Sequence, residues 1–197
     1  MLGCVIMAAG SASRFGSDKL LAKLGGKPLA AYAMDAVPDG IRTVVVTGND
    51  AVAALAAMRG IPVVRNDRPE DGVSRTIRLG TEYLMRESAL SGILYLVADQ
   101  PLLRRESVQR IAEAFLQSPD RICSAAADGR RGNPCLFPRD LLGELCALTG
   151  DCGGSRVIRA NADRLRMIDL PPEELLDADT PEALRAIEAV LSRRAEA

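Results

Sequence analysis

The sequence contains no histidine and no tryptophan, and only 3% of its 197 residues are aromatic. The lack of histidine excludes Ser-His-Asp triads and zinc sites with histidine ligands. The scarcity of aromatic side chains argues against a surface that stacks the bases of single-stranded nucleic acid. Any chemistry must therefore rely on carboxylates, cationic side chains, hydroxyls, backbone amides and a bound metal ion.

Charge and hydropathy exclude two further kinds of partner. The chain carries 25 Lys and Arg against 26 Asp and Glu, with no basic block, so a nucleic-acid backbone is not an expected ligand. No run of about 18 apolar residues is present, and no basic segment precedes the first apolar run. The five cysteines form no C-x-x-C pair and are expected as ordinary core thiols. We therefore expect a cytoplasmic protein that binds neither nucleic acid nor a membrane.

The pattern of apolar residues predicts an α/β fold. Short apolar runs at residues 4–9, 43–47, 62–65 and 93–98 alternate with segments of helical periodicity, including 29–37, 74–87 and 106–117. This order is typical of a mostly parallel central sheet with helices on both faces. A turn at 128–134 is expected between two more strands, 121–126 and 135–137. No linker or repeat is visible, so we expect one domain over residues 1–197.

A loop of small residues follows the first predicted strand, from Gly10 to Gly16. Glycine and serine allow backbone N–H groups to turn around an anion, and Arg14 and Lys19 add positive charge. The loop matches neither the P-loop nor the dinucleotide fingerprint. A solvated glycine turn is the alternative. The position directly after a buried strand, together with the two cations, favours a triphosphate-binding loop.

Two acidic positions are candidates for metal binding. Asp99 directly follows the most apolar predicted strand, at the sheet edge where α/β folds bind ligands. A carboxylate there suits Mg²⁺, although capping of the next helix is an alternative role. Asp177 and Asp179 precede Thr180 and Pro181, which are expected to open the last helix. Asp179 is expected either to be a second metal ligand or to contact a ligand without binding the metal itself. Its alternative role is that of a carboxylate favoured at the start of a helix.

Two glycine-containing segments open helices and could receive an anion. One begins at Gly72 and includes Ser74, for which a plain N-cap is an equal alternative. The other runs from Gly150 to Arg156. Arg130 and Arg131 either bind an acceptor phosphate or belong to an exposed turn.

Together these motifs resemble the MobA-like nucleotidyltransferases, in the form found in molybdenum cofactor cytidylyltransferases. The match covers A-A-G-x-S-x-R-F-G-x-x-K-L-L from Ala8, D-x-P at Asp99, G-x-P-x-L-F from Gly132 and D-x-D-T-P-E from Asp177. Val73, Thr76 and the extra residue before Arg156 depart from the family pattern. The resemblance implies a Rossmann-like nucleotidyltransferase fold and Mg²⁺ as cofactor.

The resemblance also assigns roles to individual residues. It implies a nucleotide site made of Ala8, Ala9, Gly10, Ser11, Ser13, Arg14, Lys19, Gly72 and Ser74. It implies catalytic roles for Arg14, Lys19 and Asp99, and metal binding by Asp99 and Asp179. The implied acceptor site contains Asn133, Asp151, Gly153 and Gly154.

The implied reaction is transfer of CMP from CTP to the terminal phosphate of molybdopterin, with release of pyrophosphate. CTP is inferred from Ala8-Ala9-Gly10, because the guanylyl branch of the family carries Gly-Gly in place of Ala-Gly. A client molybdoenzyme is a further implied partner. Two alternatives stay open: a cytidylyltransferase with another phosphorylated acceptor, and a non-enzymatic maturation factor that delivers nucleotide or cofactor.

Overall fold

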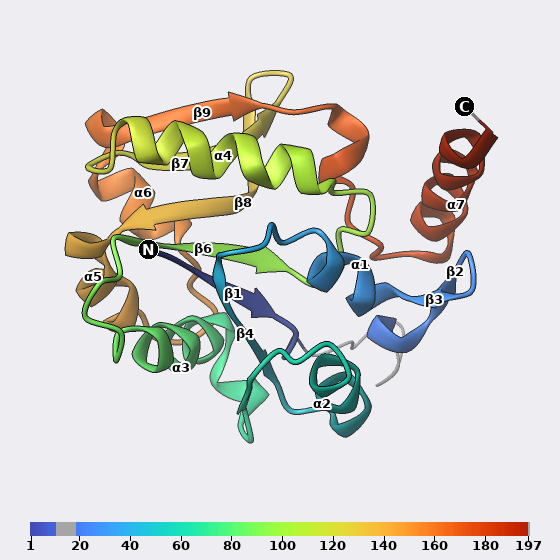
Figure 1. Ribbon diagram of the computed structural model, residues 1–197, viewed down its shortest axis with the longest axis horizontal. Coiled ribbons are helices and arrows are strands. Elements are labelled where there is room, and N and C mark those ends of the chain that lie inside the picture. The colour runs from blue at the N-terminus through green and yellow to red at the C-terminus, as the bar shows by residue number, and fades with distance from the viewer. Residues whose placement is uncertain (11–18, 197) are drawn as a thin grey trace.

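A seven-stranded sheet forms the centre of the molecule (Figure 1). The computed structural model describes residues 1–10 and 19–196. The strand order is β5-β4-β1-β6-β8-β7-β9, and β8 alone among these strands runs antiparallel to its neighbours. The strands are β1 (Leu2–Met7), β4 (Arg42–Thr47), β5 (Val63–Arg65), β6 (Gly92–Val97), β7 (Ile122–Ala127), β8 (Arg130–Pro138) and β9 (Leu165–Asp169). The predicted α/β class with a mostly parallel sheet is confirmed.

Helices cover both faces of this sheet. The α-helices are α1 (Leu29–Asp35), α2 (Asp50–Ala57), α3 (Val73–Leu84), α4 (Arg105–Gln117), α5 (Leu142–Cys146), α6 (Ser155–Ala160) and α7 (Pro181–Glu196). Helices α1, α2 and α4 pack on one face, where they share an apolar core with Cys4 and Ile6 of β1. Helices α3, α5 and α6 pack on the other face with Val5. Strand β1 is thus buried on both sides, which explains its continuous apolar run.

Helix α7 packs apart from the main sheet, on a small ribbon formed by β2 (Lys23–Leu24) and β3 (Lys27–Pro28) (Figure 1). A third apolar cluster joins Leu24, Leu102 and Ile187 there. Thr180 Oγ1 accepts a hydrogen bond from Ala183 N at 3.1 Å, as expected for the start of this helix. Within the described part of the chain, no helix is both long and apolar enough to span a membrane.

One local prediction was wrong, and one alternative that the sequence left open is excluded. The turn before β8 is shorter than the predicted 128–134, because Asp128 (φ 50°) and Gly129 (φ 72°) form a tight two-residue connection between β7 and β8. Arg130 and Arg131 therefore belong to β8. Ser74 is not the N-cap of α3: that position is Gly72, with φ 87°, and it makes no side-chain cap.

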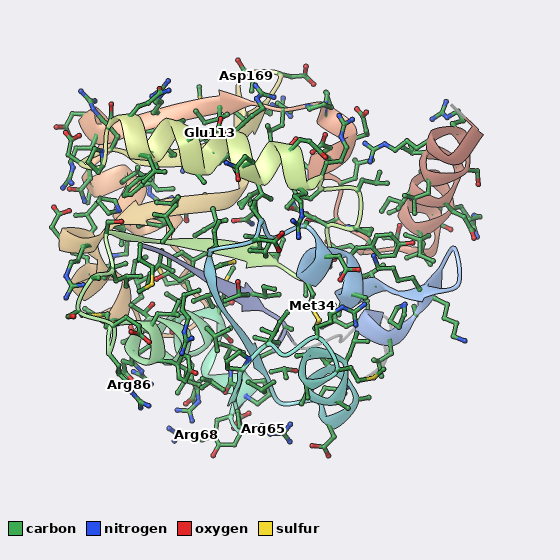
Figure 2. The ribbon with its side chains drawn as sticks, in the orientation of Figure 1. Met34, Arg65, Arg68, Arg86, Glu113 and Asp169 are labelled. Atoms are coloured by element: carbon green, nitrogen blue, oxygen red, sulfur yellow. The ribbon has the colours of Figure 1, made fainter. Side chains whose placement is uncertain are left out.

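Side-chain placement follows the usual division between core and surface (Figure 2). Exposed charged residues such as Arg65, Arg86 and Glu113 point outward from strand ends and helices. Met34 points into the core beneath α1 and is 4% exposed.

Gly80 lies where α3 approaches β1 most closely. A Cβ at Gly80 would lie 2.6 Å from Val5 Cγ1 and 3.1 Å from Val46 Cγ2. We expect Gly80→Ala to lower the free energy of unfolding, because overpacking costs about 1–3 kcal/mol while helix propensity returns only about 0.5–1 kcal/mol. Urea denaturation measures the change. The control is Gly143→Ala in α5, where a Cβ would meet nothing within 4 Å. This substitution should raise the free energy of unfolding slightly. Equal effects of the two substitutions would contradict this packing account.

Candidate active site

The first strand and the strand that carries Asp99 end at the same edge of the sheet. Strands β1 and β6 pair in parallel with Met7 opposite Val97. Ala98 N then donates to Met7 O at 3.1 Å. The loop after β1 and the turn that holds Asp99 therefore leave the sheet side by side. This is the edge at which open α/β folds bind ligands.

The start of the N-terminal loop is tightly anchored. Ala8 N donates to Val46 O at 2.9 Å, and the buried hydroxyl of Thr47 donates to Ala8 O at 2.8 Å. Ala8 and Ala9 are buried, whereas Gly10 is exposed and has open space around its Cα. Ser11, Ser13 and Arg14 lie outside the described residues, so their predicted roles stay predictions.

Lys19 is the first described residue after this loop, and its ammonium contacts two carboxylates. Lys19 Nζ lies 2.9 Å from Asp99 Oδ2 and 2.6 Å from Asp179 Oδ1. The Lys19 side chain is 11% exposed, against 27% for Asp99 and 59% for Asp179. The structure thus brings together three predicted site residues that are up to 160 positions apart in sequence.

The electrostatics of the cluster favour a charged lysine. Burial acts to lower the pKa of Lys19, but hydrogen bonds to Asp179 and Asp99, and the charges of both, outweigh burial and raise that pKa. Burial, together with the negative charge of Asp99, raises the pKa of Asp177. The carboxyl groups of Asp99, Asp177 and Asp179 therefore lie close together, and the ammonium of Lys19 partly balances their negative charge.

The C-terminal acidic segment is held against the Asp99 turn by backbone and side-chain hydrogen bonds. Ala178 N donates to Asp99 O at 2.9 Å. Gln100 Nε2 donates to Asp177 Oδ1 at 3.0 Å and to Leu175 O at 3.3 Å. Within this segment, Asp177 therefore accepts a hydrogen bond from Gln100, whereas Asp179 contacts Lys19.

An ion pair between the buried Glu174 and the half-exposed Arg104 fixes the same segment a few residues earlier in the chain. Glu174 is fully buried and accepts from Arg104 Nε at 2.6 Å and from Arg104 N at 3.1 Å. Removing one partner of such a pair leaves an uncompensated buried group, which is strongly destabilising. The pair positions residues 174–179 and takes no part in the chemistry.

The donor set suits a divalent ion that also binds substrate. Asp99 and Asp179 offer hard carboxylate oxygens on either side of the Lys19 ammonium. The amide oxygen of Gln100 is buried and has no hydrogen-bond partner among the described residues. No group of three or more His, Cys, Asp or Glu placed to hold a metal is found among residues 1–10 and 19–196. Two carboxylates without a full protein cage fit Mg²⁺, which typically keeps waters and substrate phosphates as its other ligands.

The two predicted glycine-containing segments pack directly against each other. A Cβ at Gly72 would lie 2.4 Å from Gly150 O and 2.5 Å from Asp151 N, so only glycine fits there. Ser74 N donates to Gly150 O at 3.3 Å, and Gly153 approaches Val73. Segments predicted separately for nucleotide and for acceptor thus form one continuous wall.

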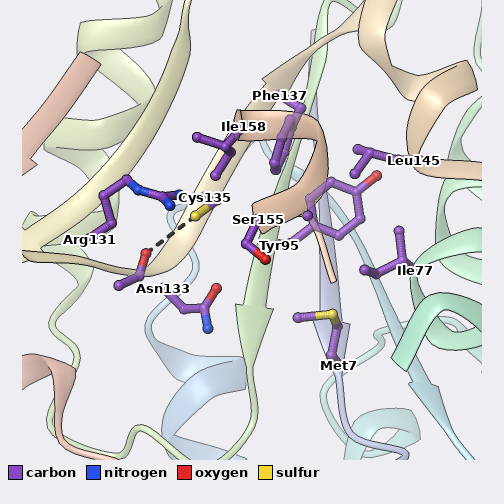
Figure 3. Close-up of a pocket in the computed structure, with 12 residues that line it drawn as sticks. Met7, Ile77, Tyr95, Arg131, Asn133, Cys135, Phe137, Leu145, Ser155 and Ile158 are labelled. Carbon is purple, nitrogen blue, oxygen red and sulfur yellow. Dashed lines mark hydrogen bonds between the residues drawn. The ribbon is translucent and has the colours of Figure 1, made fainter. Parts of the chain in front are cut away.

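A cavity of about 230 Å³ lies beside this wall, between the sheet and α3, α5 and α6 (Figure 3). Its lining is mainly apolar and includes two sulfur-bearing side chains, Met7 and Cys135, and two aromatic rings, Tyr95 and Phe137. The rings meet edge to face, with centroids 5.8 Å apart. Arg131, Asn133 and Ser155 supply its polar side chains. Figure 3 shows Arg131 entering from β8 on the side opposite Met7.

The cavity contains two of the predicted acceptor residues, Asn133 and Gly154. Asp151 is exposed, and neither it nor Gly153 lines the cavity. Met7, Tyr95, Cys135 and Ser155 line the cavity but were not predicted from the sequence for this role. Their signal is weak, because each of the first three belongs to an apolar strand and reads as core.

Comparisons with known proteins agree with the fold. The chain is 29% identical over 175 residues to a molybdenum cofactor guanylyltransferase from Cupriavidus metallidurans, covering 85% of this chain and 83% of that protein. It superimposes on a nucleotidyl transferase from Methanothermobacter thermautotroptrophicus with a TM-score of 0.83, at 23% identity, covering 98% and 99% of the two chains. It superimposes on Rv0371c from Mycobacterium tuberculosis in complex with manganese with a TM-score of 0.71, at 24% identity, covering 95% and 97%.

The family assignment rests on a separate match to a domain profile. Residues 4–165 match the profile of the MobA-like NTP transferase domain. This range includes Lys19, Asp99 and every residue that lines the cavity. The C-terminal segment with Asp179 lies beyond the matched range. The chain belongs to the MobA-like NTP transferase family.

Proposed function

We propose that this nucleotidyltransferase transfers CMP from CTP to the terminal phosphate of molybdopterin. The observation that carries the proposal is the placement of Lys19 between Asp99 and Asp179, where β1 and β6 end. The acceptor phosphate attacks the α-phosphorus of the nucleotide, a new P–O bond forms, and the bond to the leaving pyrophosphate breaks. An ionised phosphate needs no general base, which suits a chain without histidine.

The residues at the sheet edge supply positioning and charge. Lys19, with Arg14 and the amides after Ala9, binds the triphosphate and the pyrophosphate that leaves. Asp99 and Asp179 are the residues that would hold Mg²⁺, and the ion would supply positive charge against the negative charge that develops on the phosphate oxygens. The structure of Rv0371c in complex with manganese supports a divalent ion in a protein of this fold. Glu174 and Gln100 hold Asp179 in place for this role.

The cavity is the proposed acceptor site. Its volume lies below the roughly 300–1,000 Å³ typical of whole small-molecule sites, so it suits one ring system of a larger acceptor. An apolar lining with two aromatic rings favours a flat heterocycle over a sugar, which would require more hydrogen-bonding groups. Arg131 carries the positive charge at its edge. This character supports molybdopterin over a sugar phosphate as the acceptor.

The nucleotide is the second specific part of the proposal. Ala9 is 8% exposed, at the position where the guanylyl branch carries glycine. Its buried methyl group fills space that glycine would leave open, which favours the smaller pyrimidine nucleotide. Guanylyl transfer is the competing hypothesis, supported by the name of the Cupriavidus metallidurans relative. We further expect the protein to work in the cytoplasm and to pass its product to a molybdoenzyme.

Pyrophosphate release tests the reaction and the nucleotide together. With Mg²⁺ and molybdenum-loaded molybdopterin, we expect release with CTP and at least about tenfold less with GTP, ATP or UTP, as a difference of about 1.4 kcal/mol would give. Preference for GTP would keep the reaction and overturn the interpretation of Ala9. Nucleotide binding without release would favour the maturation-factor alternative.

Substitution of Arg131 tests the acceptor site. We expect Arg131→Ala to raise KM for molybdopterin about tenfold, because a charge-assisted hydrogen bond at a part-exposed site is lost, while KM for CTP changes little. The matched control is Arg130→Ala, which removes the same charge from the preceding, exposed residue that does not line the cavity. Equal effects of the two substitutions would place the acceptor elsewhere.

A further inference from the structure

Lys19 occupies the position that the two predicted metal ligands share. Its Nζ is within 3 Å of one oxygen of Asp99 and one of Asp179. Contact of an ammonium and a divalent cation with this pair of oxygens at the same time is costly, because two positive charges would then lie within a few ångströms of each other in a half-buried site. The lysine and the metal ion therefore compete for these oxygens.

We propose that Lys19 competes with the divalent cation for Asp99 and Asp179, so that the cation binds strongly only together with the nucleoside triphosphate. This inference rests on the proposed function, which assigns both carboxylates to the metal. It adds an order of binding to that function. The triphosphate attracts the lysine ammonium away from the two carboxylates, which frees the position of the metal ion. The phosphate oxygens then supply the ligands that the protein lacks.

The protein provides only part of a coordination sphere. In the part of the chain that the structure describes, no third carboxylate, thiolate or imidazole completes a metal site with Asp99 and Asp179. Asp177, the nearest acid in sequence, is bound to Gln100 at 3.0 Å. The remaining ligands of the ion must come from water and phosphate oxygens.

The two sides of the competition differ in mobility. Ala178 N binds Asp99 O at 2.9 Å and the Ala178 side chain is fully buried, so the two acidic positions are tied together by the backbone. Lys19 O accepts from Ala22 N at 3.1 Å in a short 3₁₀ turn (Lys19–Leu21), which anchors the lysine backbone. The four-carbon side chain can turn about that anchor and carry its three donors to phosphate oxygens. Lys19 thus carries the longer and more mobile side chain, whereas the backbone of the two acidic positions is fixed.

Binding of Mn²⁺, followed by the EPR signal of the free ion, tests the competition without measuring turnover. Lys19→Met keeps the length of the side chain and removes its charge. Without nucleotide, we expect Lys19→Met to bind Mn²⁺ at least about tenfold more tightly than the wild type. We also expect CTP to tighten Mn²⁺ binding far more in the wild type than in Lys19→Met, because linkage between two ligands is reciprocal.

Two controls locate the effect. Lys23→Met removes the same charge from an exposed lysine in β2 and should leave Mn²⁺ affinity within about twofold of the wild type, since exposed charges are screened. Adding Asp99→Asn to Lys19→Met should abolish the gain. If Lys19→Met fails to fold by circular dichroism, Lys19→Gln is measured against the same criteria.

An unchanged or weaker Mn²⁺ affinity in the lysine variant overturns the competition. If the wild type nevertheless releases pyrophosphate from CTP, only this inference fails and the proposed function stands. If neither protein binds Mn²⁺ in the presence of CTP and no pyrophosphate is released, the proposed function fails as well. If Lys19→Met and Lys23→Met raised Mn²⁺ affinity equally, the gain would come from the change in net charge alone, and the inference would also be overturned.

Discussion

The candidate active site depends on the docking of residues 174–179 onto the turn that follows β6. This docking places Asp179, 80 positions after Asp99 in the chain, opposite the same lysine. It is secured by the buried Glu174 with Arg104, by Gln100 with Asp177, and by the backbone bond between Ala178 and Asp99. Each contact satisfies a group that would be costly to bury alone. Without them the sheet edge would hold one carboxylate, and Lys19 would have one partner.

The same edge separates two tasks in space. Charged groups lie beyond the ends of β1 and β6, where we propose that the phosphates bind. The neighbouring cavity between the sheet and α3, α5 and α6 is lined mainly by apolar side chains. The wall formed by Gly72 and Gly150 joins the two regions. Such an arrangement can position a phosphate at the charged centre while a ring system is recognised beside it. Catalysis by positioning and electrostatic stabilisation requires this kind of division more than it requires a nucleophilic side chain.

The sequence predicted the parts of this site that carry a local signal. Lys19 was found as a cation that follows the loop of small residues, Asp99 because it follows a strand, and Asp179 because it precedes the start of a helix. The clamp by Gln100 and Glu174 was not predicted, since its partners are 70 or more residues apart and neither residue type is unusual at its position. The cavity was missed for a related reason: Tyr95 and Cys135 have the pattern of buried strand residues, and only the pairing of β6 with β8 places them around a space. The turn before β8 was placed too broadly because two arginines resemble loop residues, although they pair with β7.

The proposed site requires Asp99 and Asp179 together to hold a divalent ion that also contacts the triphosphate. Diffraction from crystals grown with Mn²⁺ and a non-hydrolysable CTP analogue tests this requirement, because the anomalous signal locates the ion. We expect a peak in contact with both carboxylates and with phosphate oxygens, and Lys19 Nζ displaced from its present contacts toward the triphosphate. A manganese peak away from both carboxylates, with Lys19 still between them, would contradict it.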